Sequence, residues 1–428
     1  MKLSKILPIA AVVIGSGLAA TACGPAAQTD GTKINIWATA KEEAVIKSVV
    51  DKYNETASEK IVYNFTAVAE GDAGTTLGKD PTVKGAPALF LCADDQINNL
   101  QSKNIILEIK GSYKEDVLAK NTGIAIAGAS AGDKLFGFPV SADNGYFLWY
   151  NKAELAEDKV GSLEAILETA KAGGKQVLLD IGNGYYAPTF LMSPQACGTS
   201  SLSWKAEEGG VSYDVNWDNE KGVAVSEYIG SLLKPYYESK TLIVGSNDEI
   251  SKGFQSGDLI AAVSGTWMEK DLLDAVADDL GAAKLPEYHP EADKTVGYQM
   301  ASFAGSKVLC VNKTRPVEEQ KVAVKLAQLL TTKEAQLKRF EVRATLPCNI
   351  EATQDPAYTE HVSIGGKALL AQSEFGALQA KSAQDRYWPI GGNIGNAYIK
   401  GLGKTEAGEE FTWQTYLKFA CDQLRVIG

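Results

Sequence analysis

The sequence predicts an α/β protein with two lobes. The stretch KINIWA, residues 33–38, alternates apolar and polar side chains as a half-buried strand does. Apolar residues from Val45 to Tyr53 follow at helical spacing, and IVYNFTAVA supplies a second strand. This strand–helix–strand order predicts parallel strands in one sheet. The roughly 400 residues after the N-terminal segment exceed what one hydrophobic core usually organises, so we expect two lobes.

The next apolar run, APALFLCADD, ends in Asp94 and Asp95. Ligands of open α/β sheets bind beyond the carboxyl ends of the strands, where these two acids would lie. Capping of the helix expected near Gln96 is the other interpretation, and one residue can serve each purpose.

Strand and helix patterns return in the second half of the chain. QVLLDIGNGYYAPTFL runs from a strand into two adjacent tyrosines, and DLIAAVSGTWMEKDLL runs from a strand through Trp267 into a helix. SKVLCVN is a strand, and RPVEEQKVAVKLAQLL is a helix. Thr331 and Glu334 fit a capping box for the helix after it. Trp37 and Trp149, which lie in apolar strands, are expected in the core.

The N-terminus has the pattern of an export signal. Lys2 and Lys5 precede an uncharged apolar run, residues 6–20, too short to span a bilayer comfortably. LAATACG then resembles a bacterial lipobox, which makes Cys23 the lipidated first residue of the mature protein. The alternative is an ordinary signal peptide cut near Ala22, which leaves a soluble secreted protein. We expect a signal at 1–22, a tether at 23–32, and no other membrane-spanning segment.

Composition and motifs exclude several functions. A formal charge of −11 argues against nucleic acid as a partner. Five arginines among 42 basic residues favour an uncharged ligand. Two histidines without metal-ligand spacing, and no recognisable catalytic motif, predict no metal, no cofactor and no enzyme. Cysteines 92, 197, 310, 348 and 421 form no CxxC pair; Cys310 and Cys348 could form one bridge, or all could be buried thiols.

Four segments carry a family resemblance. They are KINIWATAKEEAVIKSVVDKYNE, LFGFPVSADNGYFLWYNKAEL, FQSGDLIAAVSGTW and VNKTRPVEEQKVAVKLAQLLTTKEAQLKRF. Their order and spacing resemble the extracellular solute-binding proteins (family 1) of bacterial carbohydrate ABC importers, which include maltose- and maltodextrin-binding proteins. The resemblance implies a periplasmic-binding-protein-like fold, in which three hinge crossings join two lobes and the ligand lies in the cleft between them.

The resemblance also implies lobe boundaries and site residues. The first lobe is expected at 33–140 plus 306–346, and the second at 141–305 plus 347–428, with the first crossing at Pro139–Gly145. Asp143 and Asp95 match acids that hydrogen-bond sugar hydroxyls, and Trp267 matches an aromatic that stacks on a sugar ring. Further ligand-binding candidates are Tyr186 or Tyr185, Lys41 or Glu42, and Tyr387 and Trp388. The last two would replace the C-terminal aromatic of maltose-binding members, at whose position Gly395 stands here. Cys92 stands where those members carry a first-lobe tryptophan.

These inferences together predict a monomeric, lipid-anchored binding protein on the outer face of the cell membrane. It would deliver an oligosaccharide, with maltose or a maltooligosaccharide first, to the permease subunits of an importer. Aromatic rings suit the apolar face of a sugar, and carboxylates bind its hydroxyls strongly. Two alternatives stay open. One is another ligand, such as a different sugar or ferric ion held by Tyr185 and Tyr186; the other is an extracellular glycosidase that uses paired carboxylates.

Overall fold

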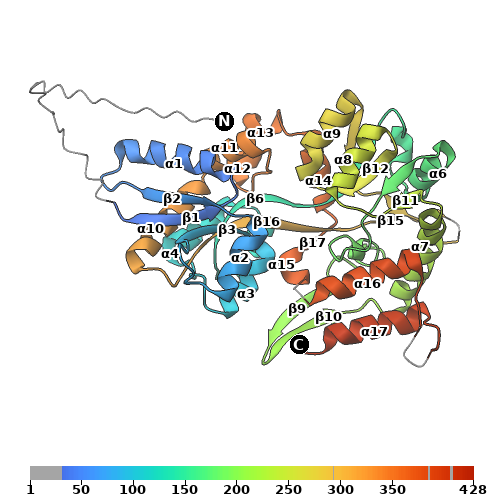
Figure 1. Ribbon diagram of the computed structural model, residues 1–428. Helices are drawn as coiled ribbons and strands as arrows, with labels where there is room; N and C mark the ends of the chain where they lie inside the picture. The colour runs from blue at the N-terminus through green and yellow to red at the C-terminus, as the bar shows by residue number, and fades with distance from the viewer. Residues whose placement is uncertain (1–30, 293, 384–385, 405–407) are drawn as a thin grey trace, which may run out of the picture.

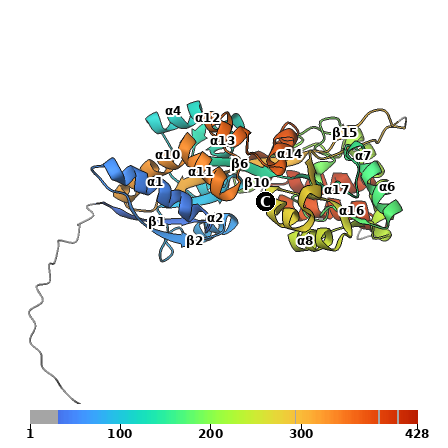
Figure 2. The same ribbon diagram turned by 90° about the horizontal axis from the view of Figure 1, so that it is seen from above.

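Two mixed α/β lobes lie side by side in the computed structural model, as predicted (Figures 1 and 2). The structure describes residues 31–428 apart from 293, 384–385 and 405–407. The predicted signal, the tether and Cys23 therefore lie outside the described residues, except for 31 and 32.

The sheet of the first lobe has the strand order β17-β16-β3-β1-β2, and β6 pairs with β16 as well. β1 runs parallel to β2 and β3, which confirms the predicted strand–helix–strand opening. The strands are β1 (Lys33–Ala38), β2 (Val62–Ala67), β3 (Leu89–Ala93), β6 (Phe138–Gly145), β16 (Ser302–Val311) and β17 (Gly376–Leu378). The short strands β4 (Ser130–Ala131) and β5 (Lys134–Leu135) pair separately.

Helices pack on this sheet through the apolar stripes that the sequence indicated. Helix α1 (Glu42–Thr56) buries Val45, Ile46 and Val50. The others are α2 (Glu70–Lys79), η1 (Asp94–Gln96), α3 (Ile97–Ser102), α4 (Gly111–Lys120), α5 (Gly123–Gly128), α10 (Val317–Leu330) and α11 (Lys333–Arg343). The predicted capping box is wrong by one residue, because Thr332 rather than Thr331 accepts the Ala335 N–H at the start of α11.

The sheet of the second lobe has the order β11-β8-β12-β7-β13. Its strands are β7 (Phe147–Asn151), β8 (Gln176–Leu178), β11 (Leu242–Ile243), β12 (Leu259–Ser264) and β13 (Leu280–Ala283). Two further ladders pair β9 (Leu202–Glu207) with β10 (Gly210–Val215), and β14 (Glu287–Tyr288) with β15 (Tyr298–Gln299). Trp149 of β7 is fully buried and Trp37 of β1 nearly so, which confirms both as core residues.

Helices of the second lobe cover this sheet and continue to the C-terminus. They are η2 (Glu157–Lys159), α6 (Leu163–Gly173), η3 (Ala187–Thr189), α7 (Glu220–Glu238), α8 (Asn247–Ser256), η4 (Thr266–Met268), α9 (Glu269–Val276), η5 (Ala277–Asp279), α14 (Ile364–Ser373), α16 (Tyr387–Lys400) and α17 (Trp413–Arg425). Three short helices lie in the last third of the chain: α12 (Ile350–Thr353), α13 (Pro356–Thr359) and α15 (Gln379–Ser382).

Three segments run between the lobes. The antiparallel strands β6 and β16 pass across the middle of the molecule (Figure 1), and β16 carries an irregularity at Lys307. A third segment lies beside β6, where the Ala142 N–H donates to the Leu346 carbonyl at 2.9 Å. The exact lobe boundaries stay a prediction.

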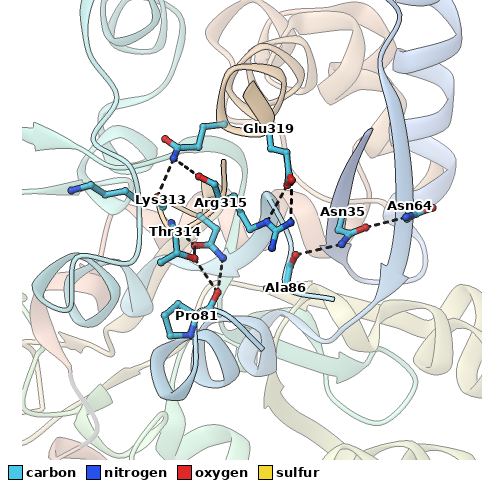
Figure 3. Close-up of polar contacts among 10 residues, drawn as sticks. Asn35, Asn64, Pro81, Ala86, Lys313, Thr314, Arg315 and Glu319 are labelled. Carbon is cyan, nitrogen blue, oxygen red and sulfur yellow. Dashed lines mark hydrogen bonds and ion pairs between the residues drawn. The ribbon is translucent and has the colours of Figure 1, made fainter. Parts of the chain in front are cut away.

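A polar network stabilises the end of the first sheet that lies opposite Asp94 (Figure 3). The Asn312 side chain donates to the Pro81 carbonyl at 3.0 Å, and the Thr314 hydroxyl donates to the same oxygen at 3.1 Å. These bonds tie the turn after β16 to the loop before β3. The antiparallel β3–β16 pair is therefore held at one end, and its other end leads from β3 into Asp94 and Asp95.

The cysteines form no bridge in the described part of the chain, where all five are free. The possible Cys310–Cys348 bridge is not formed. Cys310 instead faces Cys92 across β16 and β3 with 3.8 Å between the sulfur atoms. Cys348 lies against the side chains of Gln336 and Asn121.

Candidate ligand-binding site

A cleft of about 500 Å³ lies between the lobes and takes residues from both, as well as from the crossing strands. Three of the predicted site residues line it: Lys41, Asp143 and Trp267. It also includes Glu269, Lys307 and Arg343, which the sequence analysis did not single out. Glu269 follows Trp267 by two positions, but Lys307 and Arg343 have no local signal, because only the folding of distant segments brings them here.

Asp143 lies on the crossing strand β6 and is half-buried. The Ser141 hydroxyl donates to its Oδ1 at 2.7 Å. Because a carboxylate offers about four acceptor positions, this one bond leaves capacity for a ligand in the cleft. The extended backbone of β6 places this side chain between the lobes, where both can share it.

Trp267 is the most exposed of the seven tryptophans, with 44% of the residue accessible. It is the second residue of the turn η4, which follows the buried strand β12 after Gly265. The ring lies so close to Gly265 that a Cβ there would meet it at 2.1 Å, and the indole N–H donates to Asn247 at 3.4 Å. A large ring held against backbone and left open to a cleft is a suitable platform for an apolar ligand face.

Lys41 and Glu42 have different environments. Lys41 is exposed and lines the cleft. Glu42 is 2% exposed, and its carboxylate accepts from Arg339 at 2.8 and 3.1 Å and from Arg343. Burial alone would raise the pKa of Glu42, but the two guanidinium groups outweigh it and the pKa is lowered. Glu42 therefore ties α1 to α11, and Lys41 is the one of the two that can reach a ligand.

A smaller cavity of about 180 Å³ contains Asp95 and Trp388, together with Gln96, Asn99 and residues of α2. Trp388 is half-buried, whereas its neighbour Tyr387 is fully buried and donates its hydroxyl to the Gly184 carbonyl at 2.9 Å. The predicted aromatic platform at Tyr387 and Trp388 is therefore reduced to Trp388, because the helix α16 turns Tyr387 into the core.

The tyrosine pair belongs to an aromatic cluster. The rings of Tyr185 and Tyr186 lie 5.1 Å apart, and each lies about 5 Å from Tyr146. Tyr186 is buried, and Tyr185 is half-buried with its hydroxyl donating to Asn144 at 3.3 Å. Burial raises the pKa of Tyr186 to about 12 and that of Tyr185 well above its usual range. Both phenols therefore stay protonated near neutral pH.

Asp94 is buried, unlike its neighbour Asp95, and contacts the crossing strand β16. Its Oδ2 accepts from the Ser306 N–H at 2.7 Å and from the Ser306 hydroxyl at 3.4 Å. Burial and the charge of Asp95 raise the pKa of Asp94 to about 7. Of the two acids predicted at the end of β3, Asp95 is the one at a cavity.

A family model provides the deciding comparison. The model described as bacterial extracellular solute-binding protein matches residues 48–365, well over half of the chain and including Asp143 and Trp267. The chain belongs to this family of bacterial extracellular solute-binding proteins. The predicted family and the expectation of a protein that is not an enzyme are thereby confirmed.

Solved structures share the fold of this solute-binding protein. The maltodextrin-binding protein of L. casei BL23, solved without ligand, has a TM-score of 0.75 at 19% identity over 92% of this chain and 99% of that one. A cyclo/maltodextrin-binding protein complexed with maltotetraose has a TM-score of 0.72 at 18% identity over 92% and 96%. The maltose-binding protein of Listeria monocytogenes with maltose has 0.69 at 17% over 92% and 97%. These TM-scores establish the shared fold.

Comparison with curated protein sequences gave no match. Among the helices that the structure describes, none has the length and hydropathy needed to cross a membrane. The part of the chain described here also contains no group of three or more His, Cys, Asp or Glu side chains placed to hold a metal ion.

Proposed function

We propose that this solute-binding protein captures an oligosaccharide in the interlobe cleft and delivers it to the permease of an ABC importer. The observation that carries the proposal is the shared position of Trp267 and Asp143. An exposed indole ring and a carboxylate with acceptor capacity face one cleft that both lobes line. A pyranose offers an apolar face to such a ring and hydroxyl groups to such a carboxylate.

Maltose or a maltooligosaccharide is the first candidate ligand. The support is that similar solved structures include complexes with maltose and with maltotetraose. In this proposal Lys41, Asp143 and Trp267 contact the sugar in the larger cleft. Asp95 and Trp388 contact it from the smaller cavity, and Tyr185 is the remaining candidate of the tyrosine pair.

Ferric ion is less well supported as the ligand. Tyrosine oxygen binds ferric ion as a phenolate, yet burial keeps the phenols of Tyr185 and Tyr186 protonated. The Tyr185 hydroxyl is also engaged with Asn144.

A thermal-shift panel tests the proposal directly. Maltose, maltotriose, maltotetraose, other mono- and oligosaccharides and ferric citrate are each added to the purified protein. A true ligand at 100 times its Kd stabilises the folded protein by about 2.7 kcal/mol. We expect a maltooligosaccharide to raise Tm. The proposal would be rejected if only ferric citrate raised Tm, or if none of the sugars did.

We also propose that Cys23 carries a lipid that holds the protein at the outer face of the cell membrane, as a monomer. The support is the apolar signal at 6–20 followed by TACG. The variant Cys23→Ala should appear in the medium or stay unprocessed, as fractionation and immunoblotting would detect. Membrane partitioning equal to that of the wild type would contradict the lipid anchor.

A further inference from the structure

A chain of side-chain hydrogen bonds connects the two lobes between the larger cleft and the smaller cavity. The Tyr185 hydroxyl donates to Asn144 Oδ1 at 3.3 Å, and Asn144 Nδ2 donates to Gln379 Oε1. Gln379 Nε2 in turn donates to Asp95 Oδ2 at 2.9 Å. We call Tyr185, Asn144, Gln379 and Asp95 the interlobe relay.

The direction of every bond in the relay follows from Asp95. An ionised carboxylate only accepts hydrogen bonds, so Gln379 must turn its NH₂ group toward Asp95. Its Oε1 then faces Asn144, whose amide must donate with nitrogen and present oxygen to Tyr185. Gln379 is only 6% exposed, so water has little access to replace these bonds. Gln379 therefore orients the Asp95 carboxylate and the Asn144 amide, and through Asn144 the Tyr185 phenol.

The relay involves parts of the chain that are distant in sequence. Asp95 follows β3 of the first lobe, Asn144 lies on the crossing strand next to Asp143, and Tyr185 belongs to the aromatic cluster of the second lobe. Gln379 begins α15, which packs against both η1 and β9 and lies between the lobes in Figure 1. In the lobe orientation of this structure, the relay thus joins groups from both lobes and from a crossing strand.

We infer that Gln379 is a positioning residue of the binding site, which holds Asp95 and Tyr185 in place for the ligand from its position between the lobes. The inference rests on the proposed function in taking a sugar as the ligand. Asp95 accepts from Gln379 Nε2 and lines the smaller cavity, where a sugar hydroxyl would meet it. A side chain already held in one rotamer loses less conformational entropy when a ligand binds.

Three variants test this role. Gln379→Ala removes the relay, and Gln379→Glu places a second carboxyl group against Asp95. Gln372→Ala is the matched control. Gln372 is also buried and makes two such bonds, from the Leu285 N–H at 2.8 Å and to the Met300 carbonyl at 3.1 Å, but within the second lobe.

Calorimetry with the sugar identified by the thermal-shift panel supplies the readout, at about pH 5 and about pH 8. We expect Gln379→Ala to bind about tenfold more weakly at both pH values. Gln379→Glu should bind nearly as the wild type does at about pH 5, where one of the two carboxyl groups holds a proton. At about pH 8 it should bind about tenfold more weakly. Gln372→Ala should lower Tm and keep its affinity.

Because other charged groups lie near the relay, the affinity of each variant needs a wild-type reference at the same pH. The charges of Asp95 and Lys307 both act on Asp94, which directly precedes Asp95, and the wild type shares these groups with every variant. Affinity is therefore compared with that of the wild type at the same pH. A double-mutant cycle with Tyr185→Phe adds a second readout, because partners in one relay should give non-additive losses.

Two results would overturn the inference. In the first, folded Gln379 variants have a lower Tm and wild-type affinity at both pH values, which would give Gln379 a structural role alone. The second applies if the wild type binds no sugar and the proposed function fails. The relay is then tested by small-angle scattering of the ligand-free protein. We then expect Gln379→Ala to increase the radius of gyration relative to the wild type and Gln372→Ala, and an unchanged radius would refute the relay.

Discussion

The substitution Asp94→Asn removes a buried carboxyl group at the junction of β3 and the crossing strand β16. Oδ2 of Asp94 is bonded to Ser306, whereas Oδ1 is buried without a hydrogen-bond partner among the described residues. Burial and the charge of Asp95 raise the pKa of Asp94 from 3.8 to about 7, against the opposing effects of Ser306 and Lys307. Ionisation of this group should therefore lower the free energy of unfolding.

The size and sign of the effect follow from the two pKa values. A rise of about 3 units corresponds to about 4 kcal/mol between the protonation states. Because the folded state holds the proton more tightly, this contribution to stability is complete below about pH 4 and is lost as pH rises through about 7. From about pH 5 to about pH 8, the ionisation of Asp94 alone should lower the wild type's free energy of unfolding by on the order of 2–3 kcal/mol.

Chemical unfolding at about pH 5 and pH 8 measures this loss. The asparagine variant is neutral at both, so its free energy of unfolding relative to the wild type should improve by about 2–3 kcal/mol at the higher pH. Asp51→Asn serves as the control, because Asp51 forms only an exposed ion pair with Lys47 and should leave the pH dependence unchanged. An Asp94→Asn variant with the same pH dependence as the wild type would refute the reasoning.

Three further substitutions probe the cleft and its support. Trp267→Ala should weaken sugar binding by about 1–3 kcal/mol in calorimetry and leave Tm nearly unchanged, because Trp267 is a surface residue with 44% of its area accessible. Wild-type affinity would remove Trp267 from the site. Asp143→Asn keeps the shape and loses the charge, and it should bind about tenfold more weakly, since a hydrogen bond to a charged group contributes about 1.5–3 kcal/mol. Unchanged affinity with a lowered Tm would make Asp143 a structural residue. Glu42→Gln leaves the Arg339 and Arg343 charges without their buried partner, and it should cost about 3–5 kcal/mol of unfolding free energy. A denaturant midpoint equal to that of the wild type would contradict that role.

Local pattern was sufficient for the elements of the fold. The alternation in KINIWA and the helical spacing from Val45 to Tyr53 each lie within one element, and the structure buries Ile34, Ile36, Val45 and Ile46 as expected. Trp267 could be placed because a buried strand ends directly before Gly265, and the residue after a strand end lies at the edge of the sheet. Such predictions succeed because the period of a strand or helix determines which side chains share a face.

Contacts between distant segments decided the rest. Glu42 bonds to Arg339, which lies 297 positions later in the sequence. This predicted ligand-binding residue is therefore a partner in a buried ion pair. Asp95 meets Gln379 across 284 positions, and no pattern near either residue indicates the other. The rotation of α16 against its neighbours buries Tyr387 and leaves Trp388 half-exposed, although both are aromatic and adjacent. Sequence periodicity thus determined the faces of each element, whereas the packing of one element on another determined which polar groups meet, because that packing depends on the shapes and charges of both surfaces together.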